Sequence, residues 1–196
     1  MLPALLIAAG ASRRMGRPKQ LLPWGTGTLI EHQIATLQNA RLDVTVILGA
    51  HAERIIPVLR GTNASVHVFN HWQGGMGASI AYGVQQLSTE EAPPGILIAL
   101  VDQPLVGAAH LLRMTDAFQP GSGQIIGSRS PVGITGPPVL FDARYLPELS
   151  QLNGDQGAKP LLRKYPERTQ WIISKNGLKD MDTLRAYKQL KQHSGS

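Results

Sequence analysis

The chain carries the stretch LLIAAGASRRMGRPK from Leu5 to Lys19, around which the rest of the sequence is organised. Its apolar start is typical of a buried β-strand. The strand ends in small residues, which let a ligand approach the backbone and its free N–H groups closely. Three arginines and a lysine follow, so the pattern predicts a strand that leads into a phosphate-binding loop. The alternative for such a loop is a tight turn with a solvated basic rim.

The spacing within this loop excludes two common nucleotide-binding motifs. A Walker A loop has four residues between its first glycine and Gly-Lys-Ser/Thr. Here five residues separate Gly10 from Gly16, and Lys19 is followed by Gln20. The dinucleotide fingerprint G-x-G-x-x-G also fails, because Ser12 stands where the second glycine is required.

Length and composition limit what the chain can be. Its 196 residues are enough for one sizeable core and too few for two comfortable domains. Hydrophobic residues make up 42%, as in globular proteins, and the lack of cysteine excludes disulfides and thiolate metal sites. The first residues lack a signal-peptide pattern, and residues 1–9 are too few to span a bilayer. We therefore expect a cytoplasmic protein that does not contact a membrane.

The formal net charge of +6 favours an anionic partner. Nucleic acid is one such partner, but the basic residues are scattered and aromatic residues make up only 5% of the chain. The densest basic cluster lies in the loop after Gly10. We therefore expect a small polyanion, such as a nucleoside triphosphate, and no nucleic acid.

Strands and helices alternate along the rest of the chain, which favours one α/β domain with a mostly parallel sheet. A capping box of Thr28 and Glu31 predicts the start of the first helix. Residues 130–138, rich in Gly and Pro, predict an irregular excursion or hairpin over the active site. The other expected strands are 43–48, 65–69, 96–101, 124–128 and 169–173, and the other expected helices are 52–59, 79–87, 111–118, 157–164 and 184–190.

A candidate metal ligand follows the continuous apolar run at 96–101, which is typical of a central strand covered by helices on both faces. Pro104 cannot continue a central ladder, so Asp102 lies at the carboxyl end of the strand, where ligands bind in open α/β sheets. Its carboxylate suits Mg²⁺, which prefers oxygen ligands and triphosphate oxygens. The alternative is that Asp102 caps the next helix.

Three more aspartates are candidates for the site. Asp180 and Asp182 point the same way on an extended segment, so one of them is expected to join Asp102 on the metal. Asp182 has the alternative of capping the last helix. Asp155 precedes the expected helix 157–164, where it can cap the helix, contact a ligand or do both.

The opening stretch resembles the first motif of the MobA-like nucleotidyltransferases, and within them the molybdenum cofactor cytidylyltransferases. The family pattern is roughly L-A-A-G-x-S-x-R-M-G-x-P-K-x-L-L, and the chain differs from it only in having Ile7 at the first position. Residues 70–79, 101–106, 154–162 and 179–183 also resemble family segments, the first with an extra glycine. Residues 136–141 match the family's G-H-P-V-L-F except that Pro137 replaces the histidine.

The resemblance covers nearly the whole chain and implies a Rossmann-like fold of the nucleotide-diphospho-sugar transferase type. Residues 1–192 are expected to form this domain and residues 193–196 a disordered tail. Arg14 and Lys19 would stabilise the triphosphate and the leaving pyrophosphate, and Asp102 with Asp182 would hold Mg²⁺. The nucleotide would also contact Ala8, Ala9, Gly10, Ser12, Gly16, Asn70 and Ser79, and the acceptor side would include Gly154, Asp155 and Gly157.

The implied reaction joins CMP from CTP to the phosphate of molybdopterin or the molybdenum cofactor, with release of pyrophosphate. Ala9 favours CTP over GTP, because the guanylyl-transferring branch typically has a second glycine there. Pro137 leaves open another phosphorylated acceptor, such as a sugar or alcohol phosphate. A non-catalytic carrier or chaperone that hands the cofactor to a molybdoenzyme is also consistent with the resemblance.

Overall fold

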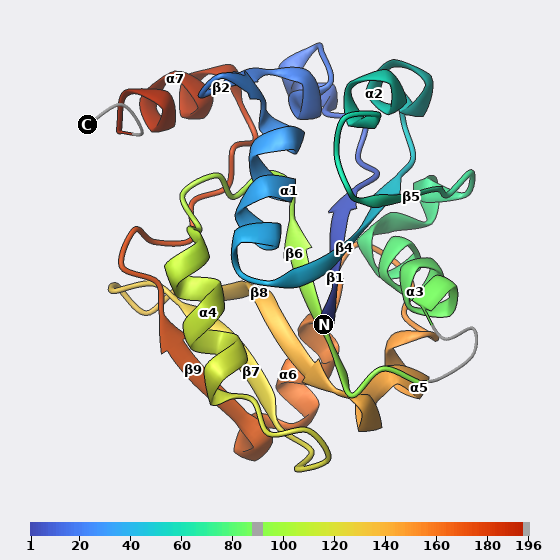
Figure 1. The fold of residues 1–196 in the computed structure, drawn as a ribbon, viewed down its shortest axis with the longest axis vertical. Helices are drawn as coiled ribbons and strands as arrows, with labels where there is room; N and C mark the ends of the chain where they lie inside the picture. The colour runs from blue at the N-terminus through green and yellow to red at the C-terminus, as the bar shows by residue number, and fades with distance from the viewer. Residues whose placement is uncertain (88–91, 194–196) are drawn as a thin grey trace.

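The protein is built on a twisted seven-stranded sheet with the strand order β5-β4-β1-β6-β8-β7-β9 (Figure 1). The structure is a computed structural model and describes residues 1–87 and 92–193. β8 runs antiparallel to both of its neighbours, and the other neighbouring strands are parallel. The strands are β1 (Leu2–Ala8), β4 (Leu42–Leu48), β5 (Ser65–Val68), β6 (Gly95–Leu100), β7 (Ile125–Arg129), β8 (Thr135–Asp142) and β9 (Thr169–Ile173).

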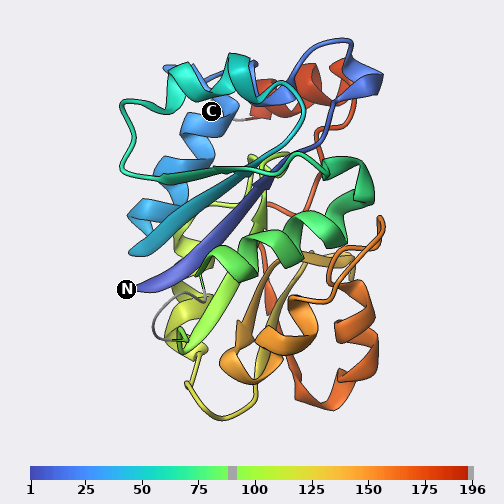
Figure 2. The same ribbon diagram turned by 90° about the vertical axis from the view of Figure 1, so that its right-hand side faces the viewer.

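Helices cover both faces of this sheet (Figure 2), which confirms the predicted α/β fold. One face carries α1 (Leu29–Asn39), α2 (Ala52–Leu59), α4 (Ala108–Ala117) and α7 (Leu184–His193). The other carries α3 (Gly75–Leu87), α5 (Leu146–Leu149) and α6 (Lys159–Lys164). A small antiparallel pair, β2 (Pro23–Trp24) and β3 (Gly27–Thr28), precedes α1.

The central strand β1 shows why the sheet needs both layers. Its side chains alternate between the two faces, as in any strand. Leu6 packs into the core under α1 and α2, whereas Leu5 and Ile7 pack into the core under α3. All three are buried, so the continuous apolar run seen in the sequence belongs to a strand covered on both sides.

Local sequence signals set several boundaries correctly. The Thr28 hydroxyl accepts a hydrogen bond from the Glu31 N–H, and the Glu31 carboxylate accepts one from the Thr28 N–H at 2.8 Å. This is the predicted capping box, and α1 begins at the next residue. Pro57 lies inside α2 without ending it, and the expected strand 169–173 is β9 as predicted.

Other boundaries differ from the predictions. The helix expected at 79–87 begins at Gly75, and the one expected at 157–164 begins at Lys159. Residues 130–138 contain the turn of a hairpin, one of the two predicted alternatives, because β7 and β8 pair antiparallel and β8 begins at Thr135. The last helix continues to His193, and the rest of the expected tail, residues 194–196, lies outside the described residues.

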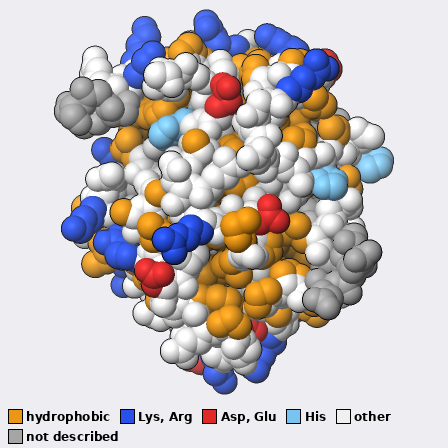
Figure 3. Space-filling view, in the orientation of Figure 1, with side chains coloured by type: hydrophobic (Ala, Val, Ile, Leu, Met, Phe, Trp, Pro, Cys, Tyr) orange, Lys and Arg blue, Asp and Glu red, His pale blue; other side chains and the backbone are white. Residues whose placement is uncertain are grey.

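Two surface features complete the fold. Within the described ranges, no helix is both long and apolar enough to cross a membrane. On the face shown in Figure 3, the Lys and Arg side chains are spread among neutral ones, mostly near the edges, and do not form one continuous basic surface.

The start of α3 touches the segment 153–157 through unusually close backbone contact. The Gly77 N–H donates to the Gly154 carbonyl at 2.7 Å, and the Gly154 N–H donates to the Gly74 carbonyl at 2.9 Å. A Cβ atom on Gly77 would overlap the backbone of Asn153. These contacts explain why α3 begins earlier than predicted: its first turn is held by residues far away in the chain.

Gly77→Ala tests this contact. The added methyl group has no room, so we expect the free energy of unfolding to fall by about 1–3 kcal/mol, measured by urea denaturation. Gly61→Ala is the matched control, because a Cβ atom there meets no neighbouring atom. Equal stability of the two variants would contradict the assigned contact.

A buried histidine links α4 to the sheet. The Ser128 hydroxyl donates to the Pro138 carbonyl at 2.7 Å, so the His110 Nε2–H donates to Ser128 at 2.8 Å. His110 Nδ1 then accepts from the Arg113 guanidinium at 3.3 Å. Burial, aided by the charge of Arg113, lowers the pKa of His110 from 6.5 to about 4. The folded protein therefore holds this imidazole neutral.

The free energy of unfolding of the unaltered protein should depend on pH because the pKa of His110 is low in the folded state. Between pH of about 6.5 and about 4 the unfolded chain binds a proton at His110 that the folded chain does not, so stability falls as pH falls. His110→Gln keeps a polar amide but cannot titrate. Urea denaturation across this range should show a shallower decline for the variant, and parallel curves would rule out the buried neutral histidine.

Candidate functional site

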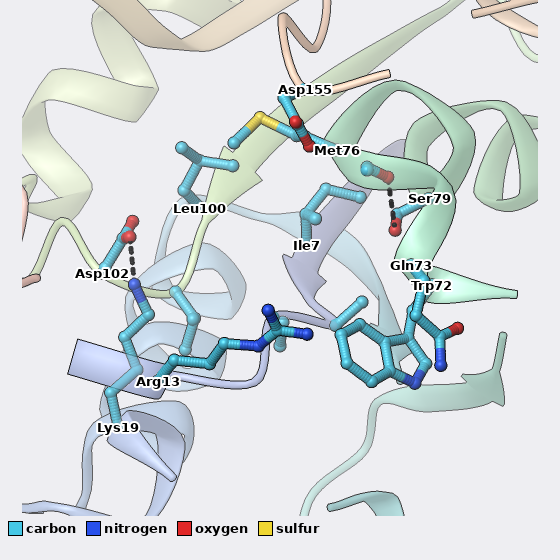
Figure 4. A pocket seen from close by; sticks show the side chains of 15 residues that line it. Ile7, Arg13, Lys19, Trp72, Gln73, Met76, Ser79, Leu100, Asp102 and Asp155 are labelled. Atoms are coloured by element: carbon cyan, nitrogen blue, oxygen red, sulfur yellow. Dashed lines mark hydrogen bonds and ion pairs between the residues drawn. The ribbon is translucent and has the colours of Figure 1, made fainter. Parts of the chain in front are cut away.

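Two adjoining cavities lie at the carboxyl ends of β1 and β6, where the sequence predicted a ligand. The first has a volume of about 450 Å³ and is bordered by the loop after β1 and the start of α3 (Figure 4). The second has a volume of about 550 Å³. Met76, Leu100 and Asp155 line both cavities, so the two spaces share a wall.

The loop after β1 is held in shape by the buried side chain of Gln20. Its amide group donates to the Ala8 carbonyl at 2.7 Å and to the Gly10 carbonyl at 3.1 Å. Ser12 and Gly16 both adopt left-handed backbone conformations, with φ of 52° and 65°. These contacts curl the loop around the first cavity, which Ala8, Ala9 and Gly10 line.

Ser12 and Gly16 were predicted to contact the nucleotide, but the structure places them outside the first cavity. The Ser12 hydroxyl instead accepts a hydrogen bond from the Lys19 backbone N–H at 3.1 Å, and the Gly16 N–H closes a turn onto the Arg13 carbonyl. Both residues shape the loop that positions Lys19.

Lys19 is the centre of a charged cluster at the mouth of the first cavity. Its ammonium group lies 2.5 Å from Asp102 Oδ2 and 3.1 Å from Asp182 Oδ1. Burial lowers the pKa of Lys19, but the charges and hydrogen bonds of the two carboxylates outweigh burial and raise it above its ordinary value. Lys19 is therefore a fixed cation, and it joins the end of β6 to the segment before α7.

Asp180 and Asp182 have distinct roles, although both lie near Asp102. Burial raises the pKa of Asp182, but Lys19 and Arg14 more than offset burial and hold it below its usual value. Burial, with the charges of Asp102 and Asp182, raises the pKa of Asp180 despite a hydrogen bond from Gln103 at 2.9 Å. Asp182 is thus the carboxylate better suited to a cation. Asp182 does not cap α7, because the Thr183 hydroxyl accepts from the Ala186 N–H.

The cluster fits a divalent cation that also binds phosphate. Asp102 Oδ1 is buried and has no hydrogen-bond partner, so this carboxylate has an unused ligand atom. Within residues 1–87 and 92–193, no three His, Cys, Asp or Glu side chains form a metal-binding group. Two carboxylates suffice for Mg²⁺, which usually completes its shell with water and substrate phosphates.

The two arginines of the loop point in different directions. Arg14, predicted to stabilise the triphosphate, pairs with Asp182 at 2.6 Å, and its side chain is 70% exposed. Arg13 lines the first cavity, and its guanidinium group points toward Trp72 in Figure 4. The family motif fixes Arg14 and leaves position 13 variable, so the prediction selected Arg14, whereas in the structure Arg13 follows the left-handed turn at Ser12 and faces the cavity.

The far wall of the first cavity comes from residues 72–79. Trp72 packs directly against Gly49, where a Cβ atom would overlap the tryptophan side chain. Ser79 lines the cavity, but its hydroxyl donates to the Gly75 carbonyl at 3.2 Å. Asn70 lines neither cavity. The sequence analysis did not select Trp72, although this residue lies within residues 70–79, which resemble a family segment.

Of the three predicted acceptor residues, Asp155 lies on the wall that the two cavities share, and the two glycines flank it in the chain. Asp155 borders both spaces and does not cap α6, whose N-cap is Ala158. Gly154 and Gly157 line neither cavity and have φ of 70° and 56°. These two glycines allow the turn that presents Asp155.

Comparison with known proteins identifies the family. The model of the MobA-like NTP transferase domain matches residues 4–169. The chain belongs to this family. The matched range includes the loop after β1, Lys19, Asp102 and Asp155, but it ends before Asp182.

Two relatives and one solved structure are similar to this MobA-like chain over most of its length. It is 34% identical over 176 residues to nicotine blue oxidoreductase of Paenarthrobacter nicotinovorans, covering 86% of this chain and 83% of that protein. It is 27% identical to the purine catabolism protein PucB of Bacillus subtilis, covering 96% and 95%. The crystal structure of Rv0371c from Mycobacterium tuberculosis H37Rv in complex with manganese matches with a TM-score of 0.79 and 26% identity, covering 97% of this chain and 98% of that one.

Lys19→Met tests the charged cluster in the absence of any substrate. It leaves the nearly buried Asp102 carboxylate without a partner, so we expect the free energy of unfolding to fall by about 3–5 kcal/mol. Arg14→Met is the matched control. It breaks an exposed ion pair to Asp182, which should cost less than about 1 kcal/mol. Urea denaturation of both variants makes the comparison, and an effect of Lys19→Met no larger than that of Arg14→Met would contradict it.

Proposed function

We propose that this MobA-like nucleotidyltransferase joins CMP from CTP to the phosphate of molybdopterin or the molybdenum cofactor and releases pyrophosphate. The observation that carries the proposal is the position of Lys19, Asp102 and Asp182 beside two adjoining cavities. One cavity is bordered by the basic loop and suits the triphosphate. The other suits the acceptor, and Asp155 lies between them.

The reaction needs alignment and charge neutralisation more than covalent chemistry from the protein. An acceptor phosphate oxygen attacks the α-phosphorus of the donor, and the bond to the pyrophosphate oxygen breaks. Holding both reactants beside one shared wall supplies the alignment. The backbone N–H groups of the loop, the ammonium of Lys19 and the guanidinium of Arg13 would face the negative charge that develops on the phosphates.

Asp102 and Asp182 would hold the divalent cation, which we propose is Mg²⁺. The unpartnered oxygen of Asp102 and the manganese in the related Rv0371c complex support this assignment. When bound, the cation neutralises charge on the triphosphate and the attacking phosphate. Lys19 would remain near both carboxylates and bind phosphate oxygens with its ammonium group.

Ala9 supports the choice of CTP as donor. It is buried, at 3% exposure, at the end of β1, and it lines the first cavity. Its methyl group narrows the space that a second glycine would leave at this position. The smaller pyrimidine base fits this restriction better than guanine.

The name of one relative supports a second candidate function. Nicotine blue oxidoreductase is 34% identical to this chain, so an assay of the oxidation state of added nicotine blue belongs beside the transfer assay. A transferase with a different phosphorylated acceptor would give turnover with a sugar or alcohol phosphate. A non-catalytic cofactor carrier would bind the pterin stoichiometrically without releasing pyrophosphate.

Asp102→Asn tests the enzyme directly. Removing the carboxylate charge should lower kcat for pyrophosphate release from CTP, pterin acceptor and Mg²⁺ by at least about 100-fold. Asp116→Asn is the matched control, because Asp116 lies exposed on α4, away from both cavities. A fully active Asp102→Asn protein would refute the proposed site.

The donor base is tested by comparing CTP, GTP, ATP and UTP. Each triphosphate should raise Tm according to its affinity for the folded protein, and we expect the largest shift with CTP. Ala9→Gly should reduce the difference between the Tm shift caused by CTP and the Tm shift caused by GTP. A larger shift and faster turnover with GTP in the unaltered protein would reject CTP as the donor.

A further inference from the structure

The floor of the second cavity is a row of residues across four neighbouring strands. Ile98 on β6 pairs with Val139 on β8, which pairs with Gly127 on β7, which pairs with Trp171 on β9. Residues paired in this way share one face of the sheet. Ile98, Val139 and Trp171 line the cavity, whereas Gly127 has no side chain to contribute.

Gly127 makes room for the indole of Trp171. A Cβ atom on Gly127 would overlap the six-membered ring of this indole. The tryptophan side chain therefore reaches sideways across β7 toward Val139, in the space that a side chain at position 127 would fill. The Arg129 guanidinium lies over the same ring, 5.3 Å from its centroid, and Arg129 does not line the cavity, whereas Trp171 does.

The rest of the second cavity combines apolar walls with a few polar groups. Met76 and Ile80 from α3 and Leu162 from α6 add apolar surface. Lys159 and Arg163, one turn apart on α6, add positive charge at one end, and Asp155 and Asp180 add carboxyl groups. The cavity is thus suited to a ligand that combines a flat apolar surface with an anionic group.

We propose that Trp171, seated over Gly127, is the residue that selects acceptors with a flat heteroaromatic ring, by stacking that ring on its indole. This inference rests on the proposed function. It names the residue that would make the second cavity bind a phosphate with an aromatic ring more tightly than a sugar or alcohol phosphate. Stacking is specific because a saturated acceptor has no π-face to place on the indole.

Trp171→Leu and Trp171→Phe test the stacking by direct binding. The probe is a pterin that carries a phosphate monoester, titrated by calorimetry without CTP or metal, with glycerol phosphate as the ring-free comparison. We expect the pterin phosphate to bind the unaltered protein more tightly than glycerol phosphate. Trp171→Leu should weaken pterin binding by about 10- to 100-fold, and Trp171→Phe should restore part of it.

Gly127→Ala gives an independent test that keeps the tryptophan. The added methyl group displaces the indole from the sheet, so pterin phosphate should bind more weakly although Trp171 is present. Ile173→Ala is the matched control on the same strand, because Ile173 is 55% exposed and does not line the cavity. The Tm shift with CTP should be retained in every variant, which shows that the donor side is folded.

The outcomes separate this inference from the proposed function. If Trp171→Leu binds pterin phosphate as tightly as the unaltered protein, or if glycerol phosphate binds as well as pterin phosphate, the stacking role is wrong. Turnover with CTP and pterin can persist in that case, and the proposed function then stands alone. If stacking is confirmed but no CMP is transferred to the pterin, the proposed function fails and the ring selectivity remains.

Discussion

The ion cluster around Lys19 is the interaction on which the site depends. Its ammonium group contacts Asp102 at the end of β6 and Asp182 before α7, and the second contact joins residues 163 positions apart. The two carboxylates lie close enough to repel each other, and the pKa of neighbouring Asp180 is raised by burial and by their charges. A fixed cation between Asp102 and Asp182 stabilises this arrangement and keeps a strongly charged mouth beside the first cavity.

A second constraint brings the two cavities together. The backbones of α3 and the segment 153–157 approach so closely that Gly75 and Gly77 have no room for a Cβ atom. This contact places Met76 and Asp155 on the shared wall. In the proposed transfer reaction, such a wall would fix the distance between donor and acceptor, so these glycines would control the alignment without contacting the reacting atoms.

The part of the site that follows local signals was predictable from the sequence. The loop after β1, Asp102 at a strand end and the capping box of α1 each depend on neighbours within a few residues, and each was placed correctly. Arg13, Trp72 and Trp171 were not selected, because their positions depend on a left-handed turn at Ser12, on Gly49 after β4 and on Gly127 in β7. Asn70 was selected from a family segment, and it lines neither cavity.

Sequence patterns alone were sufficient for the class of fold, the basic glycine-rich loop after β1 and the position of Asp102 at the end of β6. Apolar runs, caps and glycine-rich turns are local, and their effect on the backbone does not require knowledge of the rest of the chain. Three features emerged from the folded chain alone: Arg13 faces the first cavity, Lys19 pairs with Asp182 and the indole of Trp171 covers Gly127. Those choices depend on side-chain packing between strands and loops that are distant in sequence, which residue spacing does not encode.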